Sequence, residues 1–225
     1  MKNRILKGLP PREHRILSPQ LKPVVLKKGS VLYEAGERIT QVYFPETSMI
    51  SYLSGTSEGD TIEVCVVGNE GIVGLASLVS DSTAFRAVVQ IPGNAYSLSQ
   101  ELLKKEFKRC EVLHNHLLDY TNAVLVQVAQ TAVCNKFHSV QERFCRWLLM
   151  AADRTGSNQL PVTHDATARL LGSRRASVTV VAGALQRKGI IRYTRGVVTI
   201  LDRKYLESVT CECYETIVAA FTKID

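Results

Sequence analysis

Residues 163–189, THDATARLLGSRRASVTVVAGALQRKG, constrain the fold of this chain more than any other stretch. Thr163 has a side chain typical of an N-cap, and the residues after it carry small and apolar side chains at helical spacing. Gly172 is predicted to end this first helix, and Ser173 to cap a second that finishes at Gly189. Two short helices joined by a glycine turn indicate a helix-turn-helix.

The spacing inside this segment separates it from an ordinary helical hairpin with a solvated basic face, which is the structural alternative. A small residue, Ala168, is expected where the second helix crosses the first. Gly172 is expected to supply the positive φ of the turn. Val178 and Val181 are expected to bury the second helix against the first.

Polar side chains on the opposite face are of the types that reach phosphates and base edges. A recognition helix enters the major groove by its N-terminal end, where arginine can pair with guanine and hydroxyl groups can contact bases or phosphates. The predicted DNA-binding residues are Thr163, His164, Arg169, Arg174, Arg175, Ser177, Thr179 and Arg195.

The charge distribution supports this interpretation. The formal net charge is +7, and residues 1–138 hold fifteen Lys and Arg against thirteen Asp and Glu. Residues 169–204 hold nine Lys and Arg against a single acid. The positive excess therefore lies at the helix-turn-helix, as expected for a protein that binds nucleic acid.

The rest of the chain divides into segments that differ in residue composition and in hydrophobic periodicity. From Val24 to about residue 99, short Val-, Ile- and Tyr-rich segments separated by glycine turns predict an antiparallel sandwich or barrel. A long helix is expected over 111–136, and Ser139 with Glu142 forms a capping box for another. Two apolar segments flanking Arg195-Gly196 predict a hairpin, the wing of a winged helix. A closing helix is expected over 202–224.

The long helix carries apolar residues that step by four, three and four, namely Leu113, Leu117, Tyr120 and Val124. This spacing predicts a short coiled-coil seam between two copies of the chain. The alternative is one amphipathic helix packed on its own domain. A helix-turn-helix usually reads two half-sites through a twofold axis, which favours the dimer.

These features together resemble the Crp/Fnr superfamily of bacterial transcription regulators over nearly the whole chain. KKGSVLYEAGE followed by QVYFPETSMIS is similar to the opening strands of the family's β-roll. GIVGLASL followed by FRAVVQ is similar to its phosphate-cradle segment. The resemblance implies an α+β protein with an effector-sensing β-roll (1–110), a dimerisation helix and linker (111–138) and a winged helix-turn-helix domain (139–225).

The resemblance further implies a homodimer that binds a partly palindromic operator in double-stranded DNA, with RNA polymerase as a protein partner. The N-terminus lacks the apolar core of a signal peptide, and no apolar run is long enough to span a membrane. The scattered cysteines suggest no disulfide framework. We therefore expect a cytoplasmic protein.

The cradle segment departs from the cyclic-nucleotide-binding members of the family. Those members carry Gly-Glu, whose carboxylate accepts from the ribose 2′-hydroxyl, followed by an arginine that pairs with the cyclic phosphate. Here the pair is Gly74-Leu75, while Arg86 keeps the phosphate position. An unpaired buried hydroxyl costs about 1–3 kcal/mol, so tight cyclic AMP binding is not expected. Arg86 could equally be a structural arginine.

The helix hydroxyls that would meet the purine are replaced by Val128-Ala129. The candidate effector pocket that remains from the resemblance consists of Gly74, Leu75, Arg86, Ala87, Gln127, Val128 and Thr131. In the recognition helix, the cyclic-AMP branch reads bases with Arg, Glu and Arg, where this chain has Arg175, Ala176 and Val180. The operator sequence is therefore expected to differ.

No cofactor and no metal site is predicted. No cysteine precedes Cys65, which excludes the N-terminal iron–sulfur cluster of oxygen-sensing members. Cys211 and Cys213 are interpreted as a packed pair rather than a redox motif. The histidines considered as haem ligands have no spacing that selects them: His14, His114, His116 and His138.

Two other classes of function are alternatives to a DNA-binding regulator. A sensing module that controls a protein partner through a cyclic nucleotide or another small ligand would leave the basic C-terminal half without a role. An enzyme is not expected, because no Ser-His-Asp arrangement, His-Glu-x-x-His motif or P-loop is present.

Overall fold

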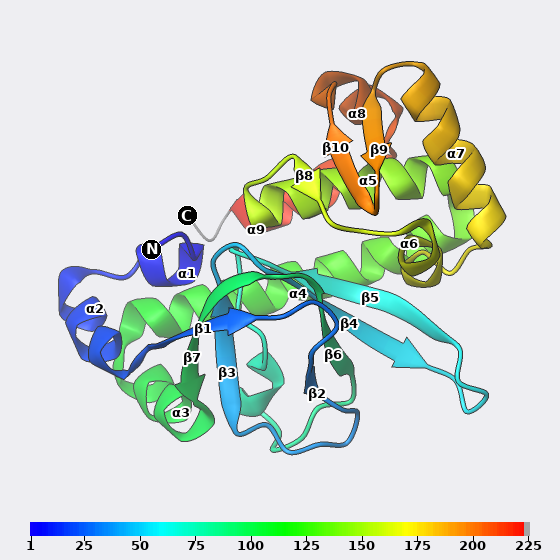
Figure 1. Cartoon of the computed structure of the whole chain (residues 1–225). Coiled ribbons are helices and arrows are strands. Elements are labelled where there is room, and N and C mark those ends of the chain that lie inside the picture. Colours follow the sequence, from blue (N-terminus) through cyan, green and yellow to red (C-terminus); the bar gives the residue numbers. More distant parts are fainter. Residues whose placement is uncertain (223–225) are drawn as a thin grey trace.

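The computed structural model describes residues 1–222 and has a β-rich part and a helical part separated by one long helix, α4 (Figure 1). The chain starts with short helical segments, α1 (Arg4–Lys7), α2 (Pro11–Leu17) and the 3-10 turn η1 (Ser18–Gln20). Pro11 stands at the first position of α2, where its missing N–H is not needed.

The β-rich part is a roll of two antiparallel sheets, which confirms the predicted fold class. One sheet has the order β1-β7-β3 and the other β2-β6-β4-β5. Val42 and Phe44 show the alternation of a half-buried strand and are fully covered. The strands are β1 (Lys22–Leu26), β2 (Val31–Tyr33), β3 (Gln41–Pro45), β4 (Met49–Gly55), β5 (Thr61–Val67), β6 (Arg86–Ile91) and β7 (Gly93–Ser99). The 3-10 turn η2 (Leu75–Leu78) lies between β5 and β6.

Three helices follow the roll. Ser99 caps α3 (Gln100–Arg109) by accepting from the N–H of Leu102. The long helix α4 spans Glu111–Phe137, and His138 leaves it in an extended conformation. The predicted capping box of Ser139 and Glu142 is present and starts α5 (Val140–Thr155). The extended residue at 138 is therefore the hinge between the long helix and the C-terminal half.

Three residues of the predicted coiled-coil seam on α4 are buried within the chain and cannot meet a partner helix, and the fourth, Val124, is half-buried. Leu113, Leu117 and Tyr120 are at most 1% exposed within the single chain, where α4 contacts β5 and α9. A different row, which we call the outer strip of α4, is exposed: Leu118 (51%), Leu125 (65%) and Val128 (37%). Both rows have helical spacing, and the face that meets the roll is fixed only by tertiary packing.

The C-terminal half has the predicted winged helix-turn-helix, with helices α6 (His164–Leu170) and α7 (Arg175–Arg187). Its small antiparallel sheet has the order β8-β10-β9, made of β8 (Gln159–Leu160), β10 (Val197–Ile200) and β9 (Ile191–Thr194). Arg195 and Gly196, with φ of 48° and 79°, form the tight turn of the β9–β10 hairpin.

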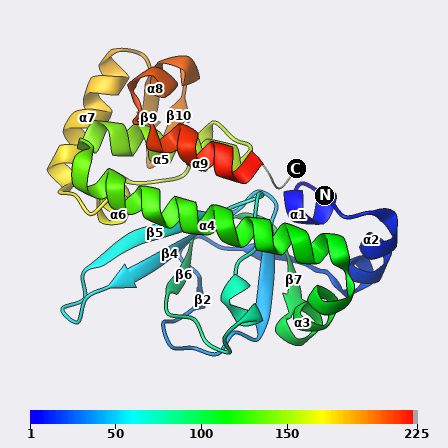
Figure 2. The same ribbon diagram turned by 180° about the vertical axis from the view of Figure 1, so that it is seen from behind.

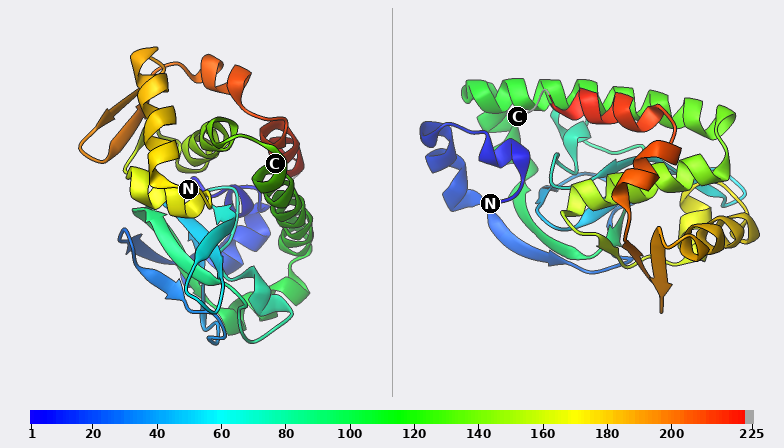
Figure 3. Two further views of the ribbon diagram at one scale, coloured as in Figure 1. Left: turned by 90° about the vertical axis from the view of Figure 1, so that its right-hand side faces the viewer. Right: turned by 90° about the horizontal axis from the view of Figure 1, so that it is seen from above.

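The single closing helix predicted over 202–224 is instead two helices, α8 (Arg203–Val209) and α9 (Cys213–Phe221). Thr210 is extended and breaks the helix, which lets α9 turn back. Figures 2 and 3 show α9 running alongside α4, and the two helices are in contact. The last two predicted residues, 223 and 224, lie outside the described part.

The roll and the helical half meet around a buried arginine, Arg154 of α5. Its Nε lies 3.3 Å from a carboxylate oxygen of Glu70 and donates to the carbonyl of Val66 at 3.3 Å. Its terminal nitrogen donates to the side chain of Gln127 on α4. The guanidinium also lies 4.9 Å from the ring centroid of Phe221 on α9. One side chain therefore joins the roll, α4, α5 and α9.

A second buried acid sits beside this junction. Glu63 of β5 accepts from the indole N–H of Trp147 at 3.1 Å and from the hydroxyl of Ser51. Burial raises the pKa of Glu63 to about 7, and the two donors and the charge of Arg146 limit the rise. Glu63 is therefore protonated in the folded protein over part of the range where it would ionise in the unfolded chain.

We expect the stability of the protein to fall as pH rises between the ordinary glutamate pKa of 4.5 and about 7 because of Glu63. In that window the folded state keeps a proton that the unfolded chain has lost. Glu63→Gln removes this titration, so the wild type should lose on the order of 1–3 kcal/mol relative to the variant from about pH 5 to about pH 8. Urea unfolding at several pH values measures the difference, with Glu58→Gln in an exposed turn as the control. Parallel pH profiles for wild type and Glu63→Gln would contradict the assignment.

Candidate nucleic-acid interface and sensor cavity

The helix-turn-helix is built by local interactions that the sequence indicated. The hydroxyl of Thr163 accepts from the N–H of Ala166 at 3.2 Å and caps α6. Gly172 has a φ of 56°, a conformation that favours glycine. A Cβ there would lie 2.8 Å from the terminal methyl of Ile62 on β5, so the turn packs closely against that side chain. Ala168 and Val178 are buried between the helices, and Val181 is half-buried.

The N-terminus of α7 differs from the prediction. Arg174, and not Ser173, occupies the N-cap position, and no side chain caps the helix. The hydroxyl of Ser173 is buried and has no hydrogen-bond partner among the described residues. The N–H of Ser177 donates to the carbonyl of Arg174 at 3.0 Å. The N–H groups of Arg175 and Ala176 have no side-chain cap among the described residues and can meet an anionic group such as a phosphate.

Three of the predicted DNA-binding cations carry no ion pair among the described residues. Arg174 and Arg175 are exposed at the start of α7, and Arg195 is exposed at the tip of the wing. Ser177, another predicted DNA-binding residue, lies in the first turn of α7 and is half-buried. Arg174 also lines a cleft of about 690 Å³ between the helix-turn-helix and the β4–β5 turn.

Other predicted contacts are engaged within the protein. The Oγ1 of Thr179 lies 3.2 Å from Nδ1 of His164, and the His164 ring lies 4.2 Å from the ring of Tyr193. Burial, assisted by the charge of Arg175, lowers the pKa of His164. Arg169 pairs with Asp165 at 2.7 Å. These residues tie α6, α7 and β9 together, so they orient the free cations.

A cavity of about 330 Å³ lies between the roll and α4. Its walls come from β4, β5, η2, α3 and α4 and are mainly apolar. The side chains that matter for its chemistry are Tyr52, Leu75, Phe85, Phe107, Leu118 and Val128. Such a lining suits an apolar ligand.

The arginine expected to pair with a cyclic phosphate is engaged within the chain, and so is the backbone N–H of Gly74. The N–H of Gly74 donates to the hydroxyl of Tyr52 at 2.7 Å. Arg86, nearly half exposed, pairs with Glu34 at 3.1 Å and does not line the cavity. This is the structural role that the sequence left open for Arg86. The ring of Tyr52 packs edge-on against Phe85, with centroids 6.1 Å apart.

Of the remaining residues in the candidate effector pocket, some line the cavity and others do not. Leu75 and Val128 line the cavity. Ala87 is buried in β6, and Gln127 donates to Val66 and contacts Arg154. The hydroxyl of Thr131 donates to the carbonyl of Gln127. No local sequence signal indicated Tyr52, because its part depends on β4 and η2 meeting in the fold.

The sequence matches the Crp-like helix-turn-helix domain over residues 142–209 and the cyclic nucleotide-binding domain over residues 23–110. The chain belongs to the Crp/Fnr family of transcription regulators. The arrangement in Figure 1, a β-rich domain followed by a long helix and a C-terminal helix-turn-helix, is the fold of this family.

Known relatives are distant in sequence and similar in fold. The global nitrogen regulator of Synechococcus elongatus is 20% identical over 186 residues, which cover 78% of this chain and 84% of that protein. FixK2 from Bradyrhizobium japonicum has a TM-score of 0.72 at 16% identity, covering 85% of this chain and 98% of FixK2. A CRP-family transcriptional regulator from Thermus thermophilus has a TM-score of 0.67 at 21% identity, covering 83% of this chain and 95% of that one.

Among the described residues, no helix combines the length and the apolar character needed to cross a bilayer.

Calorimetric titration with cyclic AMP should give no heat in the micromolar range. The wall of the cavity is mainly apolar, Arg86 is paired with Glu34, and Leu75 offers no acceptor for a ribose hydroxyl. An unpaired buried hydroxyl alone lowers affinity by about 1–3 kcal/mol. A micromolar dissociation constant would contradict this description of the cavity.

Proposed function

We propose that the protein is a homodimeric regulator that binds a partly palindromic site in duplex DNA and responds to an apolar effector in the cavity described above. The observation that carries the DNA-binding part is the start of α7. There the helix end has no side-chain cap, and two exposed arginines, Arg174 and Arg175, have no ion pair among the described residues.

Backbone contacts would come from the free cations and the helix end. A helix N-terminus with open N–H groups attracts phosphate, and Arg174 beside it adds a positive charge. Arg195 at the wing tip extends this basic surface to the hairpin. Such contacts position the protein on DNA and make binding strongly salt-dependent.

Sequence reading is assigned to the exposed face of α7. Val178, Ala182 and Leu185 face the core, and Val180 lies on the opposite side of the helix. Arg175 continues the core row, but at the first position of α7 it is exposed. Arg175 is suited to a bidentate pair with guanine. Val180 is 69% exposed, and an apolar side chain at that place suits a thymine methyl group. The operator preference would then combine both base types.

The outer strip of α4 is the proposed dimer contact. Leu118 and Leu125 are seven residues apart and Val128 follows three later, the spacing of a coiled-coil seam. Leu118 and Val128 also line the cavity. A partner helix on this strip would therefore lie beside the bound effector, which gives the effector a way to influence the dimer.

Within this proposal, residues 1–110 sense the effector, 111–138 dimerise and 139–225 bind DNA. RNA polymerase remains the proposed protein partner and the cytoplasm the proposed location. The alternative, a sensing module that acts only on a protein partner, leaves the exposed cations of α7 and the wing without a ligand.

Arg175→Ala should weaken binding to a duplex selected from a random pool by about 1–3 kcal/mol and weaken binding to random DNA much less, because a base contact is lost. Fluorescence anisotropy at several salt concentrations measures both affinities. Arg12→Ala, which removes one exposed cation from α2, is the charge-matched control. Equal losses on both duplexes would make Arg175 a phosphate contact, and salt-independent affinity would contradict DNA binding through this surface.

Leu125→Glu should convert the protein to a monomer, because it places a charge at the centre of the outer strip. Leu125 is 65% exposed in the single chain, so the fold should tolerate the change. Sedimentation velocity gives the mass, and Val25→Glu, at a 73% exposed position of β1, is the control. A dimer that persists in Leu125→Glu would place the interface elsewhere.

A further inference from the structure

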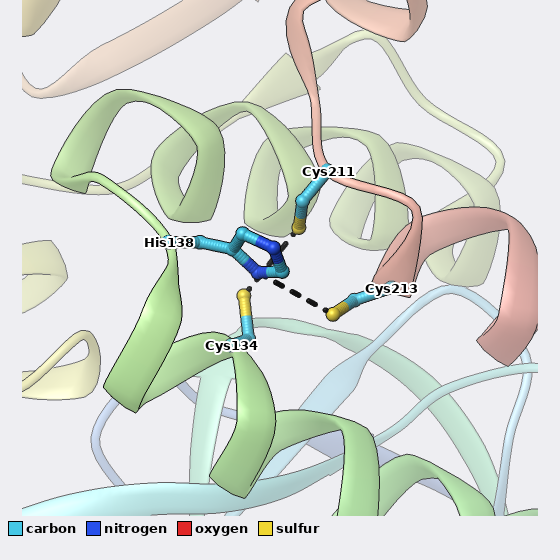
Figure 4. A group of neighbouring side chains, drawn as sticks. All are labelled: Cys134, His138, Cys211 and Cys213. Carbon is cyan, nitrogen blue, oxygen red and sulfur yellow. Dashed lines mark hydrogen bonds between the residues drawn. The ribbon is translucent and has the colours of Figure 1, made fainter.

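Three thiols and one imidazole meet where α4 ends and α9 begins. Figure 4 shows Cys134, His138, Cys211 and Cys213 with their side chains pointing toward one another. Their four potential ligand atoms all lie within 4.8 Å of one another. Two come from the end of α4 and its hinge, and two from the segment that leads into α9. We propose that these four residues form a zinc-binding site.

The distances suit one tetrahedral ion. With Zn–S bonds of about 2.3 Å, two thiolates on a tetrahedral zinc lie about 3.8 Å apart. The sulfurs of Cys134 and Cys211 are 3.5 Å apart, and the sulfur of Cys213 is 3.5 Å from Nδ1 of His138. A disulfide would need about 2.05 Å, and all three cysteines are free thiols. Small side-chain adjustments are therefore enough to surround an ion.

The histidine is held as a ligand should be. Its Nδ1 faces the thiols, while its Nε2 lies 3.2 Å from a carboxylate oxygen of Glu212. Metal-bound histidines usually donate their second ring N–H to such a carboxylate, which fixes the ring and raises its basicity. Glu212 lies between Cys211 and Cys213 in the sequence. This short segment therefore supplies two of the ligands and also the carboxylate that orients His138.

The charge around the cluster is also complementary. A zinc ion with three thiolates and a neutral imidazole carries a net charge of −1. Arg146 of α5 is 5% exposed, has no carboxylate ion pair among the described residues, and its Nε has no hydrogen-bond partner there. The hydrogen bond with Cys211 and burial raise the pKa of the Cys134 thiol, and burial raises the pKa of the Cys213 thiol; the positive charge of Arg146 opposes both rises. A buried cation of this kind offsets the charge of a loaded site.

The donor set indicates which metal and which role. Three sulfurs and one nitrogen in tetrahedral reach are typical of zinc, whereas oxygen-rich sites select magnesium or calcium. An iron–sulfur cluster would place its own iron and sulfide atoms between the cysteines and hold them farther apart. The three cysteines are at most 3% exposed and four protein ligands fill the ion's positions, so the site is structural rather than catalytic.

The location of the site indicates what a bound ion would hold together. His138 is the extended residue between α4 and α5, and α9 packs along α4. A zinc ion bound here would fasten the hinge to α9 and set the direction in which the C-terminal half leaves the long helix. Metal binding would also stabilise only the folded arrangement of these segments.

The first test measures metal on the full chain. Fully reduced wild-type protein, loaded with Zn²⁺ and desalted, should retain about one zinc per chain by elemental analysis, as expected of a single tetrahedral site. Cys211→Ser should lose most of it, and Cys110→Ser, which changes a buried thiol at the α3–α4 junction, should keep it. Equal zinc content in wild type and Cys211→Ser would overturn the proposal.

The second test does not depend on how a ligand variant folds. Reduced apoprotein titrated with Co²⁺ should develop thiolate-to-cobalt charge-transfer absorption and the visible bands of tetrahedral cobalt, which Zn²⁺ then displaces. Glu212→Gln keeps all four ligands and should weaken the Zn²⁺ affinity by about 10–100-fold. Wild-type protein that shows no such cobalt spectrum when fully reduced would overturn the proposal.

Discussion

The placement of the two halves of this protein depends on Arg154. Its guanidinium pairs with Glu70 of the roll and contacts Gln127 of α4, and it lies on the Phe221 ring of α9. The backbone around it is equally close: a Cβ on Gly68 would lie 2.4 Å from the Cβ of Arg154. Removing one partner of a buried ion pair costs about 3–5 kcal/mol, because the other charge is left without compensation. The junction is therefore specified by charge as well as by apolar packing.

The long helix α4 serves two surfaces at once. One row of apolar residues, including Leu117 and Tyr120, closes the roll, and the outer strip with Leu125 faces away from it. The cavity lies between these rows, since its wall includes both Leu117 and Leu118. With Arg86 paired to Glu34 outside the cavity wall and the N–H of Gly74 bonded to Tyr52, the chamber between the roll and α4 is mainly apolar. The fold of the family is thus retained around a cavity that lacks the arginine expected at the phosphate position.

Local patterns predicted the local structure well. The capping box at Ser139, the positive φ of Gly172 and the Arg195-Gly196 turn depend on neighbours in sequence, and each is present. Features that depend on distant contacts were missed. Two apolar rows on α4 have the same period, so the sequence could not tell which one the roll would cover. Cys134 and His138 are four residues apart on the chain, but Cys211 joins them only because α9 folds back. The i, i+4 Cys–His pair together with Cys-x-Cys was the one available signal.

The contact between Gly172 and Ile62 has a mechanical consequence. Ile62 lies on β5 near the β4–β5 turn, and the same strand supplies Val64 and Cys65 to the wall of the cavity. The turn at Gly172, which joins α6 to α7, therefore packs against one end of β5. The following residues of the same strand line the cavity. A movement of β5 at the cavity would therefore reach that turn through the side chain of Ile62. A strand in the wall of the cavity is thus in direct contact with the helix-turn-helix, separately from the connection along α4.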